Sequence, residues 1–153
     1  MAITQAMSTL FKKDVLLGDH HLDTDVIMIA LYTSSATLNA TTDGYITSGQ
    51  VANGNGYTTG GVALANKAVT EDTNSGSTTA GSGIFDADDP QWTSATFTAA
   101  GALIYNKTLG DATSNTRGAI AILNFGGDFS VSGGTFRIVF PAATRNTAIV
   151  RID

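Results

Sequence analysis

The chain of 153 residues contains no cysteine, two prolines and a single glutamate, Glu71. Without cysteine it has no disulfide framework and no thiolate metal site, so folding does not depend on the redox compartment. Glutamate and lysine normally cover the exposed faces of helices, and only four lysines accompany the one glutamate. These shortages argue against a mostly helical protein.

Basic clusters and long apolar runs are also lacking. The 8 basic residues are scattered among 13 acidic ones, for a net charge of −5. A nucleic-acid groove needs clustered Lys or Arg, so we expect no nucleic-acid partner. No apolar run approaches the roughly 20 residues that cross a bilayer, and the first residues lack the basic start and apolar stretch of a signal peptide. We therefore expect no membrane contact and synthesis in the cytoplasm.

Small polar residues are abundant. Glycine, serine and threonine make up a third of the chain, with aliphatic and aromatic runs between them. This mixture favours many short strands and tight turns over disorder, which would require low hydrophobicity and high charge. The length suits one domain with a substantial core. The sequence therefore predicts a single domain over 1–153, mainly β, folded as a two-sheet β-sandwich of jelly-roll or immunoglobulin-like topology with a short N-terminal helix.

The helix is predicted within residues 1–18, because apolar residues recur there at three- and four-residue steps and Gly18 is a suitable stop. Asp14 falls on or near the apolar stripe. Residues 26–32 are apolar on both faces, which predicts a strand covered by the helix on one side and by a second sheet on the other. The stripe of the helix either packs on the domain's own sheet or contacts a partner, and we favour the first reading.

Two strands, 91–98 and 101–107, are predicted to form a hairpin with its turn at Ala99–Gly101. Alternation along the first strand places Trp92 and Phe97 on opposite faces. Glycine pairs similarly predict turns after Phe125. Further strands are expected at 61–69, 84–87, 118–125, 135–140 and 147–152, and flexible polar loops at 72–83 and 109–116.

The possible chemical motifs are weak. His20 and His21 point to opposite faces of an extended chain and do not readily share a metal, so we read them as structural. The acidic run 86–89 lacks the spacing of an EF-hand loop. The glycine-rich stretch 54–61 lacks the Lys-Ser/Thr of a phosphate loop and is read as a turn. We therefore expect no catalysis, no cofactor and no metal site.

Three passages of the chain are similar to passages that occur in a known protein family. Residues 25–38 contain Ile-Ala-Leu-Tyr-Thr-Ser, residues 54–62 read Gly-Asn-Gly-Tyr-Thr-Thr-Gly-Gly-Val, and residues 92–106 contain Phe-Thr-Ala-Ala-Gly-Ala-Leu-Ile-Tyr-Asn. Together with Phe-Arg-Ile-Val-Phe-Pro at 136–141 and Ala-Ile-Val-Arg-Ile at 148–152, they resemble a group of small virion proteins of tailed bacteriophages. The chain differs at Ala100, where that group is expected to have arginine, and by the insertion at 109–116.

The resemblance implies a structural protein of the virion rather than an enzyme. Our first interpretation is a capsid decoration, or cement, protein that binds the major capsid protein on the outer face of the shell and forms a homo-oligomer. The alternative is a tail- or fibre-associated protein whose receptor- or glycan-binding face combines two tyrosines with residues 86–92. The candidate partner-interface residues are Ile3, Met7, Leu10, Phe11, Tyr45 and Tyr57.

Overall fold

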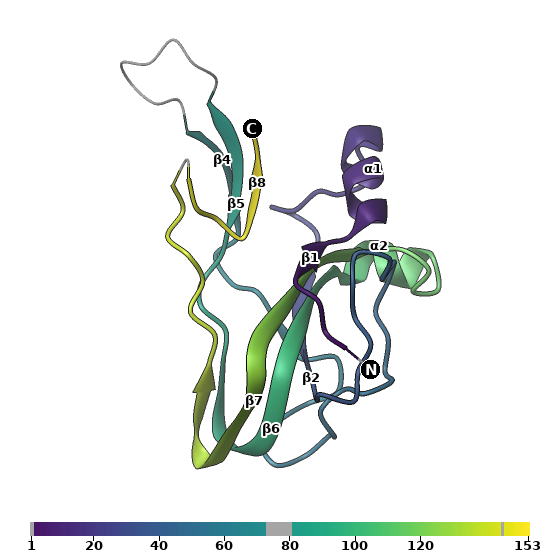
Figure 1. Ribbon diagram of the computed structural model, residues 1–153. Helices are drawn as coiled ribbons and strands as arrows, with labels where there is room; N and C mark the ends of the chain where they lie inside the picture. The colour runs from purple at the N-terminus through teal and green to yellow at the C-terminus, as the bar shows by residue number, and fades with distance from the viewer. Residues whose placement is uncertain (1, 73–80, 145) are drawn as a thin grey trace.

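The computed structural model describes residues 2–72, 81–144 and 146–153. Within these ranges the protein is mainly β, with two antiparallel sheets and a short N-terminal helix (Figure 1). This confirms the predicted fold class, although the arrangement is not assigned to either named topology. Most of the predicted loop 72–83 falls on residues 73–80, outside the described ranges, and its flanks belong to strands.

Two sheets and two helices make up the regular structure of the described residues. The predicted strand 61–69 is split between the sheets, because its two ends pair with different neighbours. The five-stranded sheet has the order β1 (Ala6–Met7), β7 (Ala119–Arg137), β6 (Gln91–Asn106), β2 (Ile27–Tyr32) and β3 (Val62–Ala63). The three-stranded sheet has the order β4 (Ala68–Asp72), β5 (Ser82–Asp86) and β8 (Val150–Ile152). The helices are α1 (Thr9–Leu17) and α2 (Lys107–Ala112).

Strands β6 and β7 run unbroken through the positions where the sequence predicted turns. Between the pairs Ala99↔Phe129 and Gly101↔Asn124, Ala100 alone on β6 lies opposite residues 125–128 of β7. This bulge leaves β6 and β7 paired on both sides of it instead of reversing the chain. The ribbon bends sharply at its lower end, close to the arrowhead of β7 (Figure 1). The predicted hairpin turns at 99–101 and after Phe125 are therefore wrong, because the small residues there form a bulge in a continuous ribbon.

A second bulge changes which side chains of β6 face the core. Between Trp92↔Phe136 and Ala95↔Gly134, two residues of β6 lie opposite one of β7, and Ser94 takes a positive φ of 50°. The extra residue resets the alternation of the strand. Trp92 and Phe97 therefore both pack against Tyr57, so their predicted placement on opposite faces is wrong.

The five-stranded sheet is covered on both faces. Along β2, Ile27, Ile29 and Leu31 face the inner core, which they share with residues of the three-stranded sheet and of the bent ribbon. Ala30 and Tyr32 face the outer core, which Ile3 and the segment 36–46 cover. The predicted burial of this strand on both sides is confirmed, and so is the second sheet on one side. The helix does not cover the other side, because the long connection after β2 packs there instead.

Helix α1 begins later than predicted. Ser8 is its N-cap, with a side chain that accepts a hydrogen bond of 3.5 Å from the Phe11 backbone N–H, and Gly18 ends it in the left-handed conformation. The residues before Ser8 are extended rather than helical, because their backbone groups pair elsewhere: Ile3 bridges to Leu38, and β1 pairs with β7. The helical part of the predicted segment 1–18 is thus its second half.

Of two connections predicted from the sequence, one is partly helical and the other is a turn as predicted. Part of the predicted loop 109–116 is helix α2, because the Asn106 side chain accepts a hydrogen bond of 3.0 Å from the Leu109 backbone N–H and caps the helix. The turn within 54–61 is confirmed: Gly54 and Tyr57 exchange backbone hydrogen bonds around two residues of positive φ. Neither helix of the described residues is long and apolar enough to cross a membrane.

Candidate functional site

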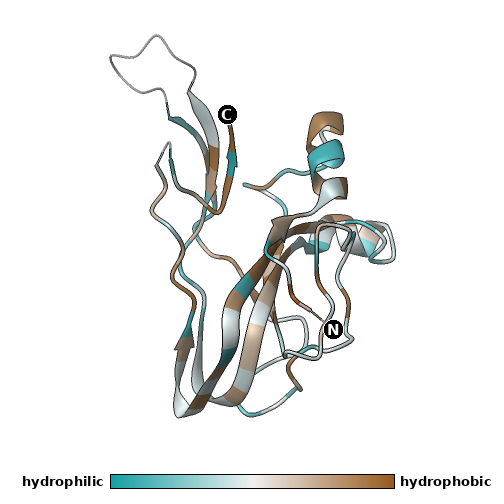
Figure 2. Ribbon diagram, viewed as in Figure 1, coloured by the Kyte–Doolittle hydropathy of each residue, from teal (hydrophilic) through white to brown (hydrophobic). Residues whose placement is uncertain are grey.

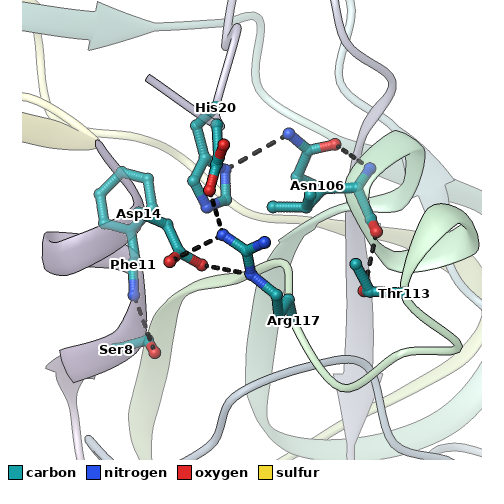
Figure 3. Close-up of polar contacts among 9 residues, drawn as sticks. Ser8, Phe11, Asp14, His20, Asn106, Thr113 and Arg117 are labelled. Carbon is teal, nitrogen blue, oxygen red and sulfur yellow. Dashed lines mark hydrogen bonds and ion pairs between the residues drawn. The ribbon is translucent and has the colours of Figure 1, made fainter. Parts of the chain in front are cut away.

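The densest group of charged side chains surrounds Arg117 (Figure 3). Its guanidinium donates from Nε to Asp14 Oδ2 at 3.0 Å, and Nη2 lies 2.8 Å from Asp14 Oδ1 and also binds Asp19. The hydrogen bonds to these two carboxylates raise the pKa of Arg117 above its usual value. The pair joins α1 to the segment before β7. The Asp14 side chain is fully buried, so its carboxylate is not accessible from solvent.

A second polar group continues from this pair to Asn106. The Asn106 side-chain amide donates to Asp25 Oδ2 at 2.6 Å. It also lies 3.3 Å from Nδ1 of His20 (Figure 3). The His20 ring also packs edge-on against Phe11, with 4.8 Å between the ring centroids. Burial lowers the pKa of His20 below its usual value, against the opposing effect of the nearby Asp14 and Asp25 carboxylates.

This polar cluster is well suited to holding elements together. It joins α1, the connection before β2, the end of β6 and the start of α2. Its carboxylates are engaged by Arg117 and Asn106, and among the described residues the hydrogen-bond partner of the His20 ring is Asn106 rather than a serine or lysine. No group of three or more His, Asp or Glu among the described residues is arranged to hold a metal ion. The sequence singled out His20 but not Arg117 or Asn106, which lie far from it along the chain.

The six predicted interface residues do not form one surface. Phe11 and Tyr57 are only 2% exposed, and Tyr57 accepts a hydrogen bond of 3.0 Å from the Leu31 backbone N–H. These two residues offer almost no side-chain surface to a partner, which corrects their selection. The physical reason is that large aromatic side chains stabilise the fold most when they are buried in its own core. Half-buried positions are occupied by the other four, Ile3, Met7, Leu10 and Tyr45.

The predicted glycan-binding face is not assembled either. Tyr45 stacks on Tyr105 in the outer core, with ring centroids 4.8 Å apart, whereas Tyr57 packs in the inner core on the other face of the sheet. Trp92 is also buried. What remains exposed near this region is a polar hollow of about 540 Å³ between the loop 86–91 and residues 137–142.

Asp89 is held firmly at that hollow. Its Oδ1 accepts from the Phe140 backbone N–H at 2.8 Å, and its Oδ2 accepts from Arg137 at 2.7 Å. The first of these hydrogen bonds, with the second, lowers the pKa of Asp89 below its usual value. Asp88 accepts a hydrogen bond from Asn66. These two carboxylates are therefore engaged within the chain.

Large exposed apolar side chains mark two other surfaces. The first, the α1 groove, is a hollow of about 400 Å³ between α1 with its following loop and the three-stranded sheet. Both α1 and the strands of this sheet carry hydrophobic residues, coloured brown in Figure 2. The wall of the groove on the helix side includes Phe11 and Val15, and Leu16 beside it is 88% exposed. Exposed apolar residues on the sheet side are Val69 and Ile152, each 54% exposed.

The second surface, the β7 patch, lies around the second half of β7 and the residues after it. It forms a hollow of about 470 Å³ that includes Phe125, Phe129, Phe136 and Val139. Phe129 is 53% and Val139 73% exposed, while Phe125 packs edge-on against Phe129. Figure 1 places the bend of β7 at the end of the molecule opposite α1. The sequence could not separate these residues from core residues, because alternation alone does not say which face is covered.

No protein-family model, curated protein or solved structure matches this chain.

Proposed function

We propose that the chain is a structural protein of a tailed-bacteriophage virion, and that it decorates the outer face of the capsid as a cement protein. The observation that carries this proposal is the pair of apolar surfaces, the α1 groove and the β7 patch, at opposite ends of one sandwich. Exposed apolar patches of this kind favour protein contacts. Two of them on a rigid body suit a protein that bridges other subunits.

The mechanism is thermodynamic linkage. A protein that binds the assembled shell but not its separated subunits adds its binding free energy to the stability of the shell. Contact with more than one subunit increases the effect, because the second contact is made at high effective concentration. The polar cluster around Arg117 supports this role by fixing α1 on the body, so that little ordering remains to be done on binding.

A catalytic role has less support. The carboxylates of the cluster are occupied by structural partners, as Asp14 is by Arg117 and Asp25 by Asn106. The sequence resemblance to phage virion proteins points in the same direction.

The second candidate is a tail- or fibre-associated protein with a glycan-binding face. The polar hollow beside residues 86–91 favours it, because Asp86 and Gln91 line it together with the apolar edges of Phe140 and Pro141. Such a combination of a few polar groups and apolar walls suits a sugar. This site would replace the aromatic face that the sequence suggested.

Copy number separates the two candidates. We expect quantitative mass spectrometry of purified virions to find the chain at a stoichiometry close to that of the major capsid protein. Electron cryomicroscopy of the same particles should then place it on the outer surface of the shell. A few to tens of copies, with density at the tail, would support the second candidate, and absence from the particles would refute both.

A further inference from the structure

We propose that His20 is a pH-sensitive switch built into the connection between α1 and β2. In the neutral form, its ring attaches this connection, the His20 loop of residues 18–26, to Asn106 at the start of α2. Protonation of the ring releases the loop. The inference concerns the isolated chain and does not depend on the proposed capsid function.

The orientation of the Asn106 amide fixes the role of each ring nitrogen. Oδ1 of Asn106 accepts a hydrogen bond of 3.0 Å from the Leu109 backbone N–H, so Nδ2 is the end that faces His20 and Asp25. An amide nitrogen can only donate. The contact of 3.3 Å between Asn106 Nδ2 and His20 Nδ1 therefore requires Nδ1 to accept, and the proton of the neutral ring lies on Nε2 (Figure 3).

A second proton on the ring has no acceptor in this arrangement. Nε2 is buried, and among the described residues it has no hydrogen-bond partner. Protonation of Nδ1 places its N–H against the amide N–H groups of Asn106, so both ring nitrogens of the charged form lack an acceptor. Turning the amide over would give His20 an oxygen but would remove the acceptor of the Leu109 N–H that caps α2. The folded arrangement therefore favours the neutral ring.

The charged groups that face the ring have opposing effects. Asp14 of α1 and two residues of the loop itself, Asp19 and Asp25, favour the charged ring, whereas Arg117 before β7 opposes it. The three-stranded sheet contributes apolar residues and a glycine to the groove that His20 lines. Burial of the ring is the largest effect, and it lowers the pKa of His20 despite the three carboxylates.

The sign of the pH dependence follows from this lowered pKa. A histidine in a released, solvated loop titrates at about 6.5. The pKa in the attached loop lies below that value, so the stabilisation by His20 is complete above about pH 6.5 and is lost as the pH falls toward the folded pKa. Because a single proton is bound, the equilibrium between attached and released loop changes by at most about tenfold per pH unit.

Two variants of the full chain separate the contributions of the two histidines. The chain contains only His20 and His21, and His21 is exposed. His21→Gln leaves His20 as the single imidazole, so proton–nitrogen NMR spectra of this variant report its proton positions and its titration. We expect the proton on Nε2 at neutral pH and a midpoint below about 6.5. His20→Gln keeps an acceptor for Asn106, the side-chain amide oxygen, but does not titrate.

Hydrogen exchange then follows the release of the loop. Suitable reporters are the backbone N–H of Asp25, which donates to the His21 carbonyl oxygen at 2.7 Å, and that of Leu109. In the wild type and in His21→Gln, their protection factors should fall between about pH 7.5 and about pH 5.5, by no more than about tenfold per pH unit. In His20→Gln they should stay constant over the same range, while circular dichroism shows that all three proteins are folded.

Several results would overturn the proposal. A neutral His20 ring with its proton on Nδ1 contradicts the contact with Asn106, and a midpoint at or above about 6.5 in His21→Gln leaves protonation with no tendency to release the loop. Wild-type protection that does not change with pH contradicts the switch directly. If His20→Gln is folded and keeps the wild-type pH dependence, other groups cause it. Should His20→Gln fail to fold, the titration in His21→Gln and the wild-type exchange still decide the outcome.

Discussion

Asp14 and Arg117 lie 103 residues apart in the sequence and form a two-point ion pair, with Arg117 Nε donating to Asp14 Oδ2 at 3.0 Å and Nη2 2.8 Å from Oδ1. The carboxylate has no exposed side-chain surface, while the arginine side chain is 30% exposed. The pair therefore attaches α1 to the body of the protein through a buried charge. The arginine offsets the free-energy cost of removing the Asp14 carboxylate from water.

Replacing Arg117 with alanine should therefore destabilise the protein severely. Removing one partner of a buried ion pair leaves an uncompensated charge and typically costs about 3–5 kcal/mol. Urea unfolding followed by circular dichroism measures the change. The matched control is Lys107→Ala, which removes the exposed pair between Lys107 and Asp111 and should cost about 0.5 kcal/mol or less. Similar losses for the two variants would show that the Asp14 carboxylate gains water when its partner is removed.

This pair also shows where the sequence stops being informative. Composition and apolar periodicity predict the β-rich class, the start of the buried strand at 26–32 and the helix stop at Gly18, because these signals are local. The apolar stripe of the helix gives no reason for Asp14 to lie on it. The reason is Arg117, and a partner at that separation leaves no local trace in one sequence.

The bent ribbon was missed for a related reason. Small residues at 99–101 and the glycines at 126–127 are compatible with a turn and with a bulge, and only the pairing of β6 with β7 distinguishes them. The same holds for Tyr45 and Tyr57, which look equivalent as aromatic residues of one connection. They lie on opposite faces of the sheet, so the sequence could not show that they form no common surface.

The bulge between β6 and β7 has no room for a side chain at Gly101. A β-carbon at this position would lie 2.6 Å from the Leu123 carbonyl oxygen and 2.9 Å from side-chain atoms of Ile3. Gly101→Ala should therefore lower the free energy of unfolding by about 1–3 kcal/mol, because the Leu123 backbone cannot easily move away from the added methyl group. Thermal and urea unfolding both report it. Gly127→Ala in the same bulge is the control, since nothing lies within 4 Å of its β-carbon position. A nearly unchanged Gly101→Ala variant would mean that the two strands separate there without loss of stability.

Alkaline pH should destabilise the protein through its buried tyrosines. Burial raises the pKa of Tyr57 to about 12, partly offset by the hydrogen bond from Leu31, and burial also raises the pKa values of Tyr32 and Tyr105. An unfolded tyrosine titrates near 10. The folded pKa lies above the unfolded one, so this contribution is complete below about pH 10 and is lost as the pH rises toward 12.

For Tyr57 alone the loss is on the order of 2–3 kcal/mol. Urea midpoints measured across this range, with phenolate absorbance as a second signal, give the slope. Tyr57→Phe should be less stable at neutral pH by about 1–3 kcal/mol, because the Leu31 N–H loses its acceptor. Above pH 10, however, its stability should fall less steeply than that of the wild type. Parallel curves would show that Tyr57 does not contribute to the alkaline transition.

The β7 patch is the surface we expect to make the main contact with the capsid, because it combines exposed aromatic and aliphatic side chains. Phe129 and Val139 are its most exposed apolar residues, at 53% and 73%. Phe129→Ser combined with Val139→Ser should leave the melting temperature within a few degrees of the wild type, since exposed side chains contribute little to folding. Binding to capsids stripped of the protein should weaken by about tenfold or more, because buried aromatic anchors dominate the energetics of interfaces. Co-sedimentation with the capsids measures the occupancy.

Leu16→Ser is the control, because it removes an exposed apolar residue at the other end of the molecule. This variant should still bind through the β7 patch, with an avidity reduced only by the loss of the second contact. Full binding by the double variant and loss of binding by the control would assign capsid attachment to α1 instead.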